Sequence, residues 1–170
     1  QIVNLPMQGL FQGAQPITSY NYGAQKFDRV KKSVRLLTIT AVTYGTVFWL
    51  ALMLVPQVFV GMFTSDAALT ETTVWAMRIF LAGVFAFGFQ GSFQNSFLAL
   101  GQAKVSLLMA LLRKIVLLIP LIFIMPVFFE NKLFGVFIAE PIADILAAIV
   151  TTIAFITWAR KNLNKPKKDT

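Results

Sequence analysis

An uncharged stretch from residue 36 to residue 65 constrains this chain more than any other part of its sequence. A helix needs about 20 apolar residues to cross a hydrocarbon core about 30 Å thick, so this stretch is long enough for one crossing. Three more apolar stretches follow, each with one or two charges: 72–103 (Arg78), 105–129 (Arg113 and Lys114) and 133–159 (Glu140 and Asp144). The sequence therefore predicts an all-α integral membrane protein.

Composition supports this class and excludes others. Hydrophobic residues make up 57% of the chain and charged residues 13%, against about a quarter charged in soluble domains. The net charge is +8, but ten of the fifteen basic residues fall in two short clusters, 26–35 and 160–168. Such clusters beside apolar runs are typical of membrane-helix flanks, and we expect no nucleic-acid partner. Without His or Cys, the chain offers no imidazole or thiolate ligand, and we expect no metal site or other cofactor.

The spans and their orientation follow from the charges between them. We expect membrane spans near residues 1–20, 34–63, 72–100, 104–128 and 133–159, and a tail at 161–170. The first is less apolar and contains Pro6 and Pro16, so it is predicted to be broken. The connections alternate between basic and acidic or neutral, which places the basic ends and the C-terminus in the cytoplasm.

The basic cluster at residues 26–35 has two interpretations. Apolar residues recur at helical spacing at Phe27, Val30, Val34 and Leu37, with basic residues between them. This pattern is typical of an amphipathic helix on a membrane surface. It equally fits the basic first turns of the following span.

The stretch before this cluster carries polar and small residues that suit a packed helix end. Gly9 and Gly13 form a small-xxx-small pair that would let helices approach closely. Gln15 and Asn21 can hydrogen-bond across helices or to carbonyls freed by Pro16, and Gly23 can take a positive φ that ends the span. These residues either pack the helix or contact a substrate.

With that spacing, the stretch resembles the multidrug and toxic compound extrusion (MATE) family of cation-coupled exporters. The residues that carry the resemblance are Gly9, Gln12, Gly13, Gln15, Pro16 and the run Ser19-Tyr20-Asn21-Tyr22-Gly23-Ala24. Weaker matches follow in the same order at Phe97-Leu98-Ala99-Leu100-Gly101, Arg113, Ile119-Pro120-Leu121 and Pro141-Ile142-Ala143-Asp144. The run at residues 19–24 is most similar to the bacterial multidrug branch of the family. The likeness extends over nearly the whole chain.

The resemblance implies a fold and a function. The family has twelve helices in two six-helix bundles, and residues 1–160 would form about five helices of the C-terminal bundle. The implied activity is antiport of small organic cations against H⁺ or Na⁺ by alternating access, across a bacterial cell membrane and together with the missing N-terminal half. A cation site that some members carry in this bundle is not expected, because its place reads Gly88-Phe89-Gln90-Gly91 without a carboxylate.

The ionisable residues within the apolar stretches are candidates for a functional role, since such groups are costly in lipid and usually paired. Glu140 and Asp144 are four residues apart, on one helix face. Matching depths at about 1.5 Å per residue predicts the pairs Arg113–Asp144 and Arg78–Glu140. Asp144 is either a structural salt-bridge partner or a group that couples ion entry to export, and Glu140 is either a vestibule residue or part of that group. Arg113 and Lys114 could instead extend to the cytoplasmic side.

A further candidate is a set of aromatic and amide residues near one helical face: Phe85, Phe89, Gln90, Phe93, Gln94 and Phe97. Aromatic rings attract organic cations through cation–π interactions, so these residues either line a substrate path or pack against lipid and protein. The sequence shows no convergent catalytic set and no filter-like loop, which makes an enzyme or a channel the poorer interpretations. A lipid-linked saccharide flippase of the same superfamily and a non-transporting membrane subunit remain the alternatives to an exporter.

Overall fold

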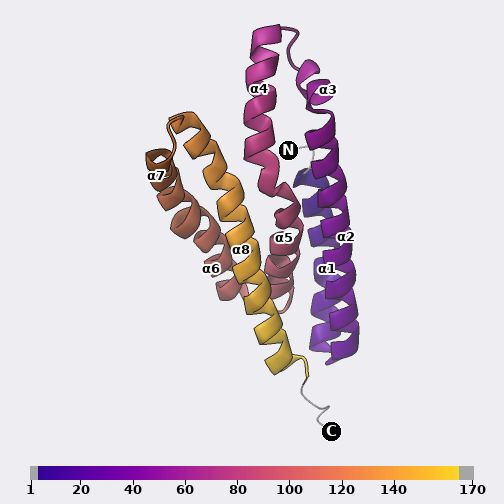
Figure 1. Ribbon diagram of the computed structural model, residues 1–170. Coiled ribbons are helices and arrows are strands. Elements are labelled where there is room, and N and C mark those ends of the chain that lie inside the picture. Colours follow the sequence, from indigo (N-terminus) through magenta and orange to yellow (C-terminus); the bar gives the residue numbers. More distant parts are fainter. Residues whose placement is uncertain (1–3, 165–170) are drawn as a thin grey trace.

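The protein is described here by a computed structural model that places residues 4–164. Secondary structure in this range is helical: α1 (Asn4–Gly23), α2 (Phe27–Leu54), α3 (Pro56–Gly61), α4 (Ala67–Phe80), η1 (Leu81–Gly83), α5 (Val84–Ala99), α6 (Ala103–Leu111), η2 (Leu112–Leu118), α7 (Ile119–Phe128) and α8 (Lys132–Asn162). The long helices run side by side along one common direction (Figure 1). Four stretches in the described range are long and apolar enough to cross a membrane: 27–54, 67–99, 103–128 and 132–162. The all-α membrane fold is confirmed.

The first helix is continuous where the sequence predicts a break. Pro16 lies inside α1, where its missing N–H costs the helix one hydrogen bond without ending it. α1 is less apolar than the four stretches and is not among them. Five membrane crossings therefore stay a prediction, as do the boundaries of the domain and the tail. Residues 1–3 and 165–170 lie outside the described residues.

The second helix begins earlier and ends earlier than the predicted span at residues 34–63. α2 starts at Phe27 and stops at Leu54, because the residue before Pro56 is disfavoured in a helix. Its basic first turns continue directly into the span. Val30 and Val34 are buried against Phe97 and Phe155 of other helices. The interpretation as a membrane-surface helix is therefore wrong, and the interpretation as the basic start of a span is correct.

The centre of the bundle is α5, which packs against α1, α2 and α8. Glycines allow two of these close approaches. A Cβ atom on Gly88 would lie 2.8 Å from the Cα of Val42 in α2, and one on Gly91 would lie 2.6 Å from the ring of Phe11 in α1. The Asp66 side chain caps the first turn of α4. The 3₁₀ turn η1 then separates α4 from α5. α6, η2 and α7 form the next hairpin arm, in which η2 and α7 pack along α8 and α6 contacts α5.

Both turns at the lower end of Figure 1 end their helices with a residue in the left-handed region. Gln25 has a φ of 54° and Gly101 a φ of 73°. At the first turn, Lys26 N–H donates to Asn21 O and Gln25 N–H to Tyr22 O, which is the Schellman arrangement. The span does end at Gly23, but the prediction that Gly23 takes the positive φ is wrong, because the left-handed residue is Gln25, two positions later.

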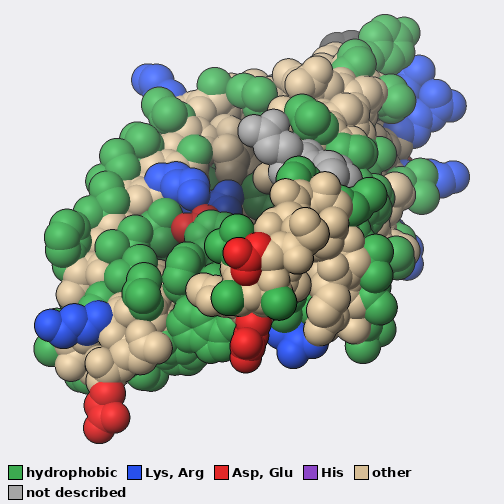
Figure 2. All heavy atoms as spheres, turned by 90° about the horizontal axis from the view of Figure 1, so that it is seen from above, with side chains coloured by type: hydrophobic (Ala, Val, Ile, Leu, Met, Phe, Trp, Pro, Cys, Tyr) green, Lys and Arg blue, Asp and Glu red, His purple; other side chains and the backbone are tan. Residues whose placement is uncertain are grey.

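Charge separates the two ends of the bundle. The lower end, where α2 starts and α8 ends, carries the bases of residues 26–35 together with Arg160 and Lys161. The opposite end carries Asp66, Glu71, Glu130 and Lys132. Figure 2 looks down on this second end, where acidic side chains lie among hydrophobic ones. The arrangement gives the bundle one basic end and one end that is acidic to neutral.

Candidate functional site

Two basic residues project toward α8 from a widened turn of helix, Arg113 half-buried and Lys114 exposed. Leu112–Leu118 form the π-helix η2 between α6 and α7. In a regular helix, the ring of Pro120 would clash with the carbonyl of Val116. Val116 lies within η2, where the helix is widened. A π turn holds more residues than an α turn, so neighbouring side chains diverge less around the axis. Arg113 and Lys114 therefore both reach the facing helix α8.

The acidic partners lie one turn apart on α8. The Asn131 side chain accepts a hydrogen bond from Phe134 N–H and caps the helix, which then continues through Pro141. Pro141 lies so close to η1 that a Cβ atom on Gly83 would be 2.7 Å from its Cα. This contact fixes α8 between Glu140 and Asp144, and Asp144 is only 5% exposed.

Arg113 and Asp144 form the ion pair that depth matching predicts. Arg113 Nε donates to Asp144 Oδ1 at 2.6 Å, and the guanidinium lies 5.2 Å from the centre of the Phe87 ring. The pairing is confirmed, and Arg113 stays inside the bundle instead of extending to the basic end. Each partner of this pair therefore supplies the opposite charge that a buried ionic group needs beside it.

Glu140 pairs with the same arm and not with Arg78. Its Oε1 lies 3.1 Å from Lys114 Nζ and 3.6 Å from Arg113 Nη2. Within residues 4–164, Arg78 makes no ion pair, so the predicted Arg78–Glu140 pair is wrong. The sequence missed Lys114 because only the π turn brings it to α8. Figure 2 shows a place on the upper face where basic and acidic side chains lie next to each other.

A small polar cavity lies beside this charge cluster, which we define as Arg113, Lys114, Glu140 and Asp144. The cavity has a volume of about 250 Å³ and is lined from α1, α5, α6 and η2 by these residues: Gln8, Phe11, Phe87, Gln90, Gly91, Gln94, Asn95, Ala110, Arg113 and Lys114. The amide oxygen of Gln90 is buried and has no hydrogen-bond partner among the described residues. Gln90 of α5 and Arg113 of η2 thus line the same cavity.

The predicted aromatic face of α5 divides between two sides of the helix. Gln90 and Gln94 line the cavity, together with Phe87, which the sequence reasoning missed although it lies three residues before Gln90. Phe85 instead packs edge-on against Trp49 at 5.6 Å, and Phe93 stacks on Phe155 at 4.8 Å. Phe89 is exposed on the surface, and Phe97 is buried against Phe155 and Trp158. A common face for all these residues is wrong, because the spacing from Phe85 to Gln90 turns well away from one side of a helix.

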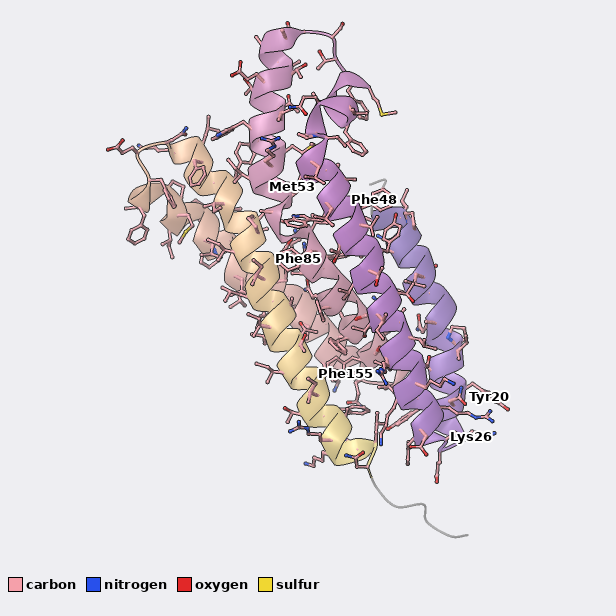
Figure 3. The ribbon with its side chains drawn as sticks, turned by 45° about the vertical axis from the view of Figure 1, so that its right-hand side comes forward. Tyr20, Lys26, Phe48, Met53, Phe85 and Phe155 are labelled. Carbon is pink, nitrogen blue, oxygen red and sulfur yellow. The ribbon has the colours of Figure 1, made fainter. Side chains whose placement is uncertain are left out.

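The glycines and amides of the opening motif do not join the charge cluster. Nothing lies within 4 Å of a Cβ atom on Gly9 or Gly13, so these residues do not bring two described helices together. Asn21 donates to Ile17 O in its own helix, and Tyr20 is 73% exposed and points away from the bundle in Figure 3. Gln15 is half-buried and Pro16 exposed.

The motif instead holds the basic end together through residues beside those predicted. Thr18 and Ser33 hydroxyls share a hydrogen bond of 2.8 Å between α1 and α2. Ser19 donates to Ala99 O of α5, also at 2.8 Å. The Tyr22 ring packs 6.2 Å from both Phe27 and Trp158. The motif therefore joins four helices at one end. Within residues 4–164, no group of three or more acidic side chains gathers to hold a metal ion.

Comparison with known proteins gives one family throughout. The MatE family model matches residues 1–124. The multidrug export protein MepA of Staphylococcus aureus (strain N315) is 26% identical over 152 residues, which cover 88% of this chain and 33% of MepA. MepA of Staphylococcus saprophyticus is also 26% identical, over 157 residues. The chain thus spans about a third of the length of these curated relatives.

Solved structures of similar proteins agree with this match. The MATE multidrug transporter DinF-BH has a TM-score of 0.83 and 34% identity, and the match covers 97% of this chain and 36% of that one. An inward-facing multidrug resistance MATE family transporter of the MOP superfamily has a TM-score of 0.89 at 18% identity, over 98% of this chain and 38% of that one. The second likeness concerns the fold alone.

Proposed function

Because the chain belongs to the MatE (multidrug and toxic compound extrusion) family, we propose that it forms most of the C-terminal membrane bundle of a multidrug exporter. The remaining helices would come from residues of the same polypeptide outside this chain. The exporter would move small organic cations out of a bacterial cell in exchange for H⁺ or Na⁺. The names of its relatives support export of drugs, and the charge cluster supports coupling to an ion.

The observation that carries the proposal is the buried Arg113–Asp144 pair beside an amide-lined cavity. A carboxylate within a membrane span is costly and is retained where it is paired or serves a transported charge. Arg113 also lies 3.6 Å from Glu140, so its guanidinium has a second acid within reach. The cluster is formally neutral, with two acids and two bases.

These contacts suggest how an ion could be exchanged. A proton or Na⁺ that enters the cavity competes with Arg113 for the Asp144 carboxylate. Once Asp144 is neutralised, Arg113 moves toward Glu140 and displaces Lys114 from it. The Gln90 amide oxygen accepts a hydrogen bond or coordinates the ion on its way to Asp144. These ion pairs join η2 to α8. The exchange therefore changes the contacts between these two elements.

The drug itself would bind elsewhere. Pockets for drug-sized ligands are typically about 300–1,000 Å³, and this cavity is about 250 Å³ and lined by two bases. A drug-sized organic cation would be too large for it. We therefore assign Gln90 and Gln94 to the ion path, and the predicted substrate-lining role of Phe85, Phe89 and Phe93 gains no support from their separate positions.

Replacement of Asp144 by Asn tests the proposal. Cells that express the complete polypeptide are loaded with a fluorescent organic cation, and efflux is followed under imposed H⁺ or Na⁺ gradients. We expect Asp144→Asn to reduce efflux toward that of cells without the protein at near-normal expression. Glu130→Gln removes an exposed acid between α7 and α8, is the matched control and should keep parental efflux.

The double variant separates coupling from structure. If Asp144 couples the ion, Asp144→Asn with Arg113→Gln stays inactive although the protein is made. If that double variant recovers both expression and efflux, the pair is only a structural salt bridge. Parental efflux by Asp144→Asn alone would also contradict the coupling role. The gradient that drives parental efflux identifies the ion.

A further inference from the structure

A second site of a different kind lies at the basic end, between α2 and α8. Here the two helices leave a groove of about 520 Å³. Apolar residues of both helices form its walls, among them Ile39 of α2 and Ile156 of α8, which are 52% and 42% exposed. The groove is therefore open to the surroundings of the bundle and apolar along its length.

The floor of the groove is aromatic. Phe93 of α5 stacks on Phe155 of α8 with ring centres 4.8 Å apart, and both line the groove. Figure 3 shows Phe155 pointing from α8 toward the space beside α2. The Lys31 Nζ donates to Asn164 Oδ1 at 2.7 Å and so links the two walls at the basic end.

Charge is concentrated at that same end. Lys31 and Arg35 come from α2 and Arg160 from α8, and all three line the groove and are exposed. Among the residues that line it, none is Asp or Glu. None of the three bases forms an ion pair within residues 4–164, and Asp28 lines a neighbouring hollow. Three cations from two helices thus converge without an acidic partner among the described side chains.

We propose that this groove binds an anionic phospholipid of the cytoplasmic leaflet. The phosphate lies at Lys31, Arg35 and Arg160, and one acyl chain runs along the groove past Ile39 and Ile156. From Lys31 to Ile39 the helix rises about 12 Å, and half of the hydrocarbon core is about 15 Å thick. The charged end and the apolar length thus match the headgroup and the chain of one lipid.

Other occupants fit less well. A soluble phosphate compound would leave the apolar walls uncovered. An apolar helix of the same protein would bury the three bases without partners, which is costly. Basic pockets between membrane helices on the cytoplasmic side are the arrangement that binds acidic lipid headgroups. A groove between α1 and α2 also contains two bases, Arg29 and Lys32, but both come from one helix.

That second groove supplies the matched control. The complete polypeptide is purified in detergent, mixed with phosphatidylglycerol or phosphatidylcholine, and examined by native mass spectrometry. Arg35→Gln with Arg160→Gln removes two charges from the proposed site. Arg29→Gln with Lys32→Gln removes the same charge from the same end of α2 but from the other groove. All four residues are exposed, so both double variants should fold, which their thermal unfolding verifies.

We expect the parental protein to retain phosphatidylglycerol over phosphatidylcholine. Each base near a membrane surface contributes about fivefold, so the Arg35/Arg160 variant should bind phosphatidylglycerol about 25-fold more weakly. The Arg29/Lys32 variant should bind it nearly as the parent does. Equal loss in both variants would mean general attraction by the basic end, and would overturn the site. Equal retention of the two lipids by the parent would overturn it as well.

A change in shape without a change in charge tests the acyl chain. Ile39→Trp adds bulk inside the proposed groove and should weaken retention of phosphatidylglycerol. Leu36→Trp adds the same bulk at an exposed position in the α1–α2 groove and should not. Inorganic phosphate should fail to displace the lipid. If Ile39→Trp binds as the parent does, or if inorganic phosphate competes with the lipid, the groove holds no acyl chain and the proposal is wrong.

Discussion

Arg113 is the partner of a buried acid, which would be left unpaired if Arg113 were replaced. It is joined to Asp144 at 2.6 Å, and Asp144 is 5% exposed. Removal of one partner of a buried pair typically costs about 3–5 kcal/mol, whereas removal of both charges can be nearly neutral. We therefore expect Arg113→Gln to lower the thermal unfolding temperature of the purified complete polypeptide strongly. Arg113→Gln with Asp144→Asn should recover most of the loss, and a double variant no more stable than Arg113→Gln would contradict the pairing.

Two glycines with different surroundings, Gly88 and Gly9, give a second prediction that contains its own control. A Cβ atom on Gly88 would lie 2.8 Å from Val42 Cα and 2.9 Å from Ala41 O, both backbone atoms that cannot move aside. Gly88→Ala should thus force α5 away from α2 and destabilise the protein by about 1–3 kcal/mol. Gly9→Ala meets nothing within 4 Å and should be neutral or slightly stabilising. Detergent-solution unfolding measures both, and similar losses would contradict the close packing of α5 on α2.

At the scale of the element, the π-helix decides which bases reach α8. Deletion of Val116, an exposed residue of η2, should close the widened turn into a regular one while the flanking helices keep their faces. Lys114 would then turn away from Glu140, and we expect efflux by the complete polypeptide to fall although the protein is still inserted. Val116→Ala is the matched control and should keep parental efflux. Full efflux by the deletion variant would mean that the π turn has no part in the charge cluster.

The same element shows why sequence reasoning predicted one ion pair and missed another. Arg113 and Asp144 could be matched by depth alone, since rise per residue is nearly constant along antiparallel helices. The partner of Glu140 depends on rotation about the helix axis, and the π turn before Pro120 changes that rotation, which depth matching does not register. The spans were predicted from long apolar runs, but the end of α2 at Leu54 reflects Pro56 and not hydropathy. The predicted common face of α5 is wrong because it combines amide residues that line the cavity with aromatic residues that pack elsewhere.

At the scale of the whole molecule, charge is distributed along the direction of the helices. The bases of 26–35 and 160–161 gather at one end, and Asp66 and Glu71 lie at the other. Basic connections stay on the cytoplasmic side during insertion, so this distribution favours a cytoplasmic C-terminus. The orientation also determines which leaflet the α2–α8 groove meets. Topology is therefore the prediction on which both the lipid site and the direction of export depend.

Single cysteine variants test this orientation directly, since the chain contains no native Cys. Lys26→Cys and Lys161→Cys lie at the basic end, and Ala68→Cys lies in the first turn of α4 at the other end; all three positions are exposed. In intact cells, a membrane-impermeant thiol reagent should label Ala68→Cys alone. After permeabilisation it should label all three, which verifies that each thiol is reactive. Labelling of Lys26→Cys or Lys161→Cys from outside would reverse the orientation, because the positive-inside bias would then have failed at the two strongest basic clusters of the chain.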